Sequence, residues 1–130
     1  YFDGKATLND ISEYILKNPS YDVYLSDVLI CSEGSFFNSC RYYPCDVFTA
    51  SRMRFGIMPP HPAMFFKREL HERIGLYSTK YDIAGDFDLI VRMFLVEGLT
   101  YTSCNRVFIK MESGGLSDKI ASKIKLQKEL

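Results

Sequence analysis

Apolar residues near the start of the chain recur at the spacing of an amphipathic helix. The apolar positions are Leu8, Ile11, Ile15 and Leu16. Thr7 and Asp10 have the spacing of a capping box, with Asp in place of the usual Glu, and Pro19 stops the run. We therefore predict a helix over residues 8–17.

A longer apolar stripe lies in the second half of the chain. Its members are Ile83, Phe87, Ile90, Val91, Phe94 and Leu95. Because these positions share one face at 3.6 residues per turn, the segment predicts a long amphipathic helix. We expect this helix to end at Gly98, since glycine commonly follows a helix.

Runs of β-branched and aromatic residues between these segments predict strands. The predicted strands cover residues 22–30, 36–43, 63–66 and 100–110. A turn at 33–35 would join the first two as a hairpin, and short helices are predicted over 46–54, 67–74 and from Ser117 onward. Helices alternate with strands and no linker interrupts them, so residues 1–130 predict a single α/β domain.

Composition excludes several classes of protein. With 130 residues, of which 47% are hydrophobic, the chain has the size and apolar content of one globular domain. Its 16 basic and 16 acidic residues cancel, which argues against a nucleic-acid binder. No apolar run approaches the roughly 20 residues of a membrane span.

The four cysteines, Cys31, Cys40, Cys45 and Cys104, lack the paired spacing of a zinc site. We expect them to be reduced, as in a cytoplasmic protein, with a Cys40–Cys45 bridge as the alternative. A cytoplasmic location at the inner face of the membrane is compatible with the same composition.

Acidic residues gather where the long helix is predicted to begin. Asp82, Asp86 and Asp88 flank this point, where free backbone N–H groups and the helix dipole keep a carboxylate ionised. An ionised carboxylate can serve as a general base if a substrate hydroxyl reaches it. The alternative is that these acids only cap the helix, with no part in a reaction.

Two further segments could bind a ligand. In Pro59-Pro60-His61-Pro62 the prolines restrict the backbone, so His61 is held in a defined place, although a structural hydrogen bond would explain it equally. In Gly114-Gly115-Leu116-Ser117 the backbone could approach a phosphate at the start of a helix, although a simple turn is the alternative.

Taken in order, these segments resemble a known family. The matching segments are His61-Pro62-Ala63-Met64-Phe65-Phe66, Ala84-Gly85-Asp86-Phe87-Asp88-Leu89 and Gly114-Gly115-Leu116-Ser117. Their combination resembles the C-terminal half of bacterial family 2 glycosyltransferases, of the kind that build capsular, colanic-type or O-antigen polysaccharides. The resemblance runs over nearly the whole chain.

The resemblance implies part of a GT-A fold, a mixed sheet with flanking helices, that transfers a sugar from a nucleotide sugar with inversion. The acceptor would be a hydroxyl of a saccharide or a lipid-linked saccharide. Asp86 matches the catalytic base, although Gly85 stands where the commoner family pattern has glutamate. Asp88 takes the neighbouring acidic position and His61 a place in the substrate pocket. Gly114, Gly115 and Ser117 would belong to a flexible loop over that pocket.

The family's nucleotide-binding half and its Asp-x-Asp-type motif would precede Tyr1. We therefore expect the divalent cation, Mn²⁺ or Mg²⁺, only together with that half, and no activity from these residues alone. An uncovered sheet edge would also favour a homodimer of the fragment. The alternative function is a non-catalytic binding or assembly module that keeps a glycosyltransferase-like fold.

Overall fold

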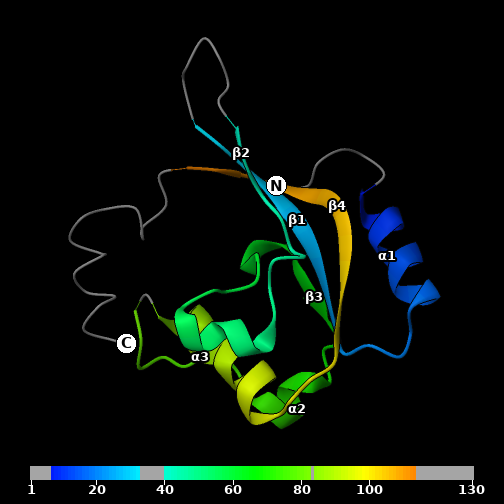
Figure 1. The fold of residues 1–130 in the computed structure, drawn as a ribbon. Helices are drawn as coiled ribbons and strands as arrows, with labels where there is room; N and C mark the ends of the chain where they lie inside the picture. Colours follow the sequence, from blue (N-terminus) through cyan, green and yellow to red (C-terminus); the bar gives the residue numbers. More distant parts are fainter. Residues whose placement is uncertain (1–6, 33–39, 83, 114–130) are drawn as a thin grey trace.

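The computed structural model describes residues 7–32, 40–82 and 84–113, which form a small α/β domain with a four-strand mixed sheet (Figure 1). The predicted turn at 33–35, Ile83, the Gly114–Ser117 segment and the final helix lie outside the described residues.

Strand β1 (Val23–Cys31) is the centre of the sheet. It pairs in parallel along its whole length with β4 (Tyr101–Glu112). On its other edge, β3 (Met64–Phe66) pairs antiparallel with the first half of β1, and β2 (Cys40–Tyr43) pairs antiparallel with the second half. The strand predictions are therefore confirmed in outline, although β2 begins only at Cys40 within the described part of the chain. Within that part no strand pairs with the outer edge of β3, and the predicted homodimer stays a prediction.

Helices pack on both faces of the sheet (Figure 1). Helix α1 (Thr7–Lys17) contributes Ile11 to the core on one face, whereas Leu8 and Leu16 of its predicted apolar face are exposed. On the other face lie α2 (Leu70–Ile74) and α3 (Gly85–Val91). Their buried residues are Leu70, Ile74, Leu89 and Ile90, which pack with Val23 and Leu25 of β1.

The predicted long helix is shorter and less regular than its apolar stripe suggests. Helix α3 begins at Gly85 and continues into a π-helical turn, η3 (Arg92–Val96), in which Glu97 N–H donates to Arg92 O over five residues. This wider turn still buries Phe94, but it leaves Leu95 exposed. Of the described residues of the predicted stripe only Ile90 and Phe94 are buried, whereas Leu89 and Met93, which lie outside it, are buried as well. The periodicity therefore located the buried face only in part and did not indicate the change of helix type.

Three short segments also differ in type or length from their predictions. The predicted helix over 46–54 is a 3₁₀ helix, η1 (Ala50–Phe55), and η2 (His61–Ala63) is a second 3₁₀ turn before β3. Helix α2 begins at Leu70, later than predicted, because the chain enters it through turns from Lys67. Gly75 ends α2 as expected, with a φ of 75°.

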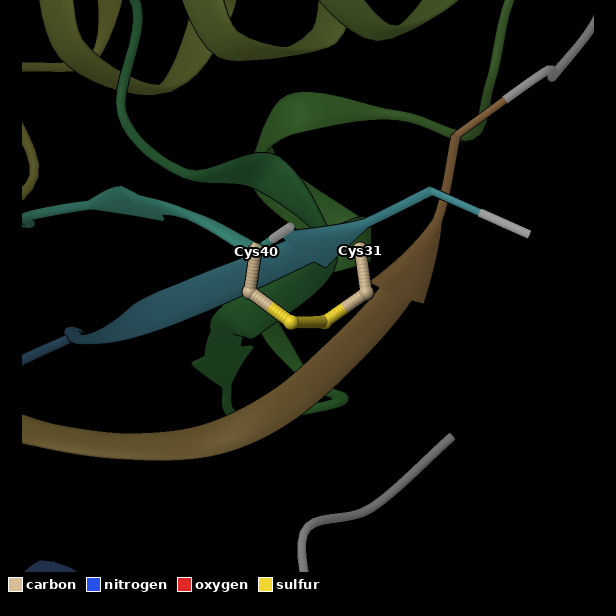
Figure 2. The surroundings of a disulfide bond; sticks show 2 residues. All are labelled: Cys31 and Cys40. Carbon is tan, nitrogen blue, oxygen red and sulfur yellow. A yellow bond between two sulfur atoms is a disulfide. The ribbon is translucent and has the colours of Figure 1, made fainter. Parts of the chain in front are cut away.

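The expectation of four reduced cysteines is wrong. Cys31 and Cys40 form a disulfide between β1 and β2, which Figure 2 shows at the end of the strand pair. The two residues are register partners, so the hairpin places their side chains next to each other. The Cys40–Cys45 alternative is wrong as well, because Cys45 is free and buried. Disulfides persist mainly in oxidising compartments, so this bridge weighs against the cytoplasmic location, which stays a prediction.

Candidate functional site

The segment before β3 holds His61 in a fixed position. Pro60 precedes the η2 turn and Pro62 lies within it, and Ala63 N–H donates to Pro60 O at 2.8 Å. Ala63 itself is completely buried against the sheet. The backbone on either side of His61 is therefore anchored, while its imidazole is 30% exposed.

The imidazole of His61 contacts two other polar side chains. Its Nδ1 lies 3.3 Å from Asp86 Oδ2, within ion-pair distance. Its Nε2 lies 3.0 Å from the hydroxyl of Tyr77, whose ring packs edge-on against the imidazole. The three residues come from η2, from the loop after α2 and from the first turn of α3. We refer to Tyr77, His61 and Asp86 as the site triad.

Asp86 is placed to meet a ligand. Its carboxylate is 51% exposed although one oxygen contacts His61, so an approaching hydroxyl can reach it. The contact with His61 directs the carboxylate of Asp86 toward η2.

Asp88 has different surroundings. Its Oδ2 accepts from Nε and Nη2 of Arg92, at 3.1 and 2.8 Å. The same guanidinium donates to the carbonyl oxygens of Ile74 and Leu76 where the chain leaves α2. Gly75 fits this arrangement, because a Cβ there would lie 3.2 Å from Arg92 Nη1. Asp88 thus orients an arginine that ties α3 to the end of α2.

Partial burial and the charge of Asp86 both change the pKa of the Tyr77 hydroxyl. Burial raises the pKa of the Tyr77 phenol, and the nearby Asp86 carboxylate raises it further. Both effects favour the protonated phenol, so the hydroxyl remains a hydrogen-bond donor at neutral pH.

A cavity of about 250 Å³ adjoins His61. Its wall is almost entirely apolar and combines residues of the sheet with the proline-rich segment. The lining residues are Val28, Ile30, Tyr43, Met58, Pro59, Pro60, His61, Pro62 and Met111. Tyr43 closes one side by donating its hydroxyl to Met58 O at 3.1 Å. A small apolar group could therefore bind next to the site triad.

A second polar cluster lies within the sheet around the buried carboxylate of Asp27. Asp27 accepts from Cys45 N–H at 2.8 Å and from the hydroxyl of Tyr42. The register of β1 against β4 shifts at Asp27, which marks a bulge. Burial, followed by the interaction with Asp27, raises the pKa of the Cys45 thiol to about 12. Cys45 therefore stays a thiol and is no nucleophile.

Within residues 7–32, 40–82 and 84–113, no three His, Cys, Asp or Glu side chains gather so that they could hold a metal ion. No helix in these ranges is long and apolar enough to cross a membrane.

The structure thus brings together two of the residues that the sequence singled out, His61 and Asp86. It gives Asp88 a separate partner, and Gly114, Gly115 and Ser117 lie outside the described residues. The roles of all these residues stay predictions. Tyr77 was missed, because nothing in the local pattern relates it to a histidine 16 positions earlier.

Comparison with known proteins adds no assignment. The chain matches no known family model, and a search of curated proteins found no similar sequence.

Proposed function

We propose that this chain is the acceptor-side part of an inverting glycosyltransferase with a partial GT-A fold, active in the synthesis of cell-surface polysaccharide. The observation that carries the proposal is the 3.3 Å contact between His61 Nδ1 and Asp86 Oδ2. These residues belong to two separate motifs of the resemblance, 25 positions apart, and they meet beside an open cavity. A four-strand mixed sheet with helices on both faces agrees with the expected fold.

In the proposed reaction Asp86 accepts the proton of an acceptor hydroxyl. The acceptor oxygen then forms a bond to the anomeric carbon of the donor sugar, and the bond from that carbon to the nucleoside diphosphate breaks with inversion. His61 fixes one oxygen of the carboxylate, which leaves the other oxygen for the acceptor. A half-exposed carboxylate that is held in one orientation is suited to this role.

The donor's diphosphate and its divalent cation belong, in this proposal, to residues outside the given sequence. The described residues gather no set of His, Cys, Asp or Glu side chains that could hold this cation. The contribution of this chain is the base, its orientation and the surface that the acceptor contacts.

A non-catalytic binding module is the second candidate. The apolar lining of the cavity beside His61 favours it, because such a site can hold a ligand without chemistry. The two candidates differ in what they require of Asp86. Binding in the cavity does not need its carboxylate, whereas transfer does.

The test is Asp86→Asn in the intact protein that carries the nucleotide-binding half. Asparagine keeps the size of the side chain but cannot accept the proton, so transfer should fall by about 10²–10⁴. Transfer is measured as release of nucleoside diphosphate that depends on added acceptor.

The matched control is Asp46→Asn, which makes the same chemical change at an exposed carboxylate away from the triad. It should retain the original rate. Unchanged transfer by Asp86→Asn would remove the assignment of the base. A complete absence of transfer by the unmodified protein, together with ligand binding in the cavity, would favour the binding module.

A further inference from the structure

We propose that Tyr77 is a positioning residue for the reaction, because its hydroxyl selects the tautomer and orientation of His61 and through it the orientation of Asp86. This inference rests on the proposed function for its effect on rate. The effect of Tyr77 on the hydrogen bonding of His61 is independent of that function and can be measured without any reaction.

Nδ1 is the nitrogen of His61 that faces the carboxylate of Asp86. At 3.3 Å from Asp86 Oδ2, a bare lone pair on His61 Nδ1 would meet a second lone pair and be repelled. The attractive arrangement places the proton on Nδ1. In the neutral imidazole the other nitrogen, Nε2, is then the acceptor.

The other nitrogen of His61, Nε2, has Tyr77 as its partner. The hydroxyl of Tyr77 lies 3.0 Å away and can donate its proton to this nitrogen. Partial burial and the charge of Asp86 both raise the pKa of the phenol, which keeps it a donor. Tyr77 therefore satisfies the tautomer that presents an N–H to Asp86, and the edge-on contact of the two rings restricts rotation of the imidazole.

The orientation of His61 in turn affects the carboxylate of Asp86. Asp86 is 51% exposed, so its side chain would sample several rotamers without a fixed partner. His61 with its proton on Nδ1 can donate to Oδ2 of Asp86 and so restricts the rotamers of that side chain. When Tyr77 no longer holds Nε2, His61 can rotate or move its proton to Nε2, and Asp86 loses its fixed partner.

The experiment compares the imidazole nitrogens of the protein with those of its Tyr77→Phe variant, using ¹⁵N-histidine labelling and long-range nitrogen–proton spectra. In the original protein, neutral His61 should carry its proton on Nδ1. In Tyr77→Phe, a substantial fraction should carry it on Nε2. The only other histidine of the sequence, His71, serves as an internal reference, since its Nδ1 lies 3.1 Å from Gly75 O and should not respond.

The matched control is Tyr81→Phe, which removes a hydroxyl four positions away and should leave the His61 signals unchanged. In the active enzyme, Tyr77→Phe should lower kcat roughly 10-fold with little change in KM, as expected for loss of orientation. In a His61→Asn background, where an amide N–H can still face Asp86 but nothing reaches Tyr77, Tyr77→Phe should have no further effect.

Unchanged His61 nitrogen signals in Tyr77→Phe would overturn the inference, whatever the rate does. If those signals change while Asp86→Asn still transfers normally, Tyr77 positions His61 as inferred and the proposed function fails. If Asp86→Asn abolishes transfer while Tyr77→Phe changes neither signals nor kcat, the function stands and the role of Tyr77 is wrong.

Discussion

Asp86 and Asp88 lie two positions apart on α3, yet their environments have little in common. The Asp86 side chain is 51% exposed and has the imidazole of His61 at 3.3 Å. The Asp88 side chain is 29% exposed and faces a permanently charged guanidinium through two short contacts. The first carboxylate is half exposed, whereas one oxygen of the second accepts two hydrogen bonds from arginine.

The difference follows from the helix itself. At 3.6 residues per turn, two positions correspond to a rotation of about 200°, so the two side chains leave the helix on opposite sides. One side faces η2 and the open surface, and the other faces the chain leaving α2. Acidic side chains in one helical turn can therefore differ, one lying accessible at the surface and the other holding an arginine that supports the helix.

The largest loss of stability should come from removing the guanidinium of Arg92, which Asp88 holds. Arg92→Met keeps much of the side-chain volume but removes the donors to Asp88, Ile74 O and Leu76 O. We expect the free energy of unfolding to fall by about 2–4 kcal/mol, because partly buried acceptors lose a charged partner. Urea denaturation measures it.

Asp86→Asn, in the same experiment, should change stability by no more than about 0.5 kcal/mol, as exposed substitutions do. Arg54→Met is the control for loss of an exposed arginine. Equal stability losses in Arg92→Met and Asp86→Asn would mean that both sides of α3 support the fold, and that Asp86 and Asp88 do not differ in this respect.

A somewhat smaller effect is expected from the Cys31–Cys40 disulfide, which lies at the end of the β1–β2 pair. The bridge closes a short loop, so its loss should cost about 2–3 kcal/mol through the entropy of the unfolded chain. Replacing both cysteines by alanine avoids side reactions of free thiols. The change is again measured by denaturation, with and without a dithiol reductant.

The stability lost with the disulfide should not depend on Asp86, since the disulfide joins β1 and β2 whereas Asp86 lies on α3. The reductant should destabilise the original protein and leave the alanine variant unaffected. If the Asp86→Asn substitution altered the cost of reduction, the triad and the strand pair would be coupled, and the site could not be treated as a separate region.

The smallest effect concerns a second structural carboxylate, Asp22, whose Oδ2 accepts from the backbone N–H and the hydroxyl of Thr100. These bonds, the backbone bond first, lower the pKa of Asp22 in the folded protein. The ionised form therefore contributes stability above the ordinary pKa of an aspartate, and that contribution is lost as the pH falls through the lowered value.

Asp22→Asn should accordingly cost about 1 kcal/mol at pH 7. The difference from the original protein should shrink below about pH 4, where the unmodified carboxyl becomes protonated as well. Denaturation curves at several pH values test this. A constant difference down to pH 2 would show that Asp22 does not act through its charge.

Several features of the molecule were determined by the sequence alone. The run from Val23 onward predicted the central strand, and the segments at Met64 and Tyr101 predicted two of its neighbours. The helix after Thr7 and the stop at Gly75 were also predicted. These features depend on local preferences, on alternation or periodicity and on the conformational freedom of glycine, all of which can be read from neighbouring positions.

The tertiary structure decided which side chains meet. His61, Tyr77 and Asp86 come from separate elements, and Cys31 finds Cys40 only because a hairpin brings both into register. The π-helical turn at Arg92 likewise follows no local pattern. Contacts between distant positions depend on how the elements pack against one sheet, and spacing along the chain does not record that packing. For this reason the sequence could nominate Asp86 and His61 separately, whereas their pairing and the role of Tyr77 required the fold.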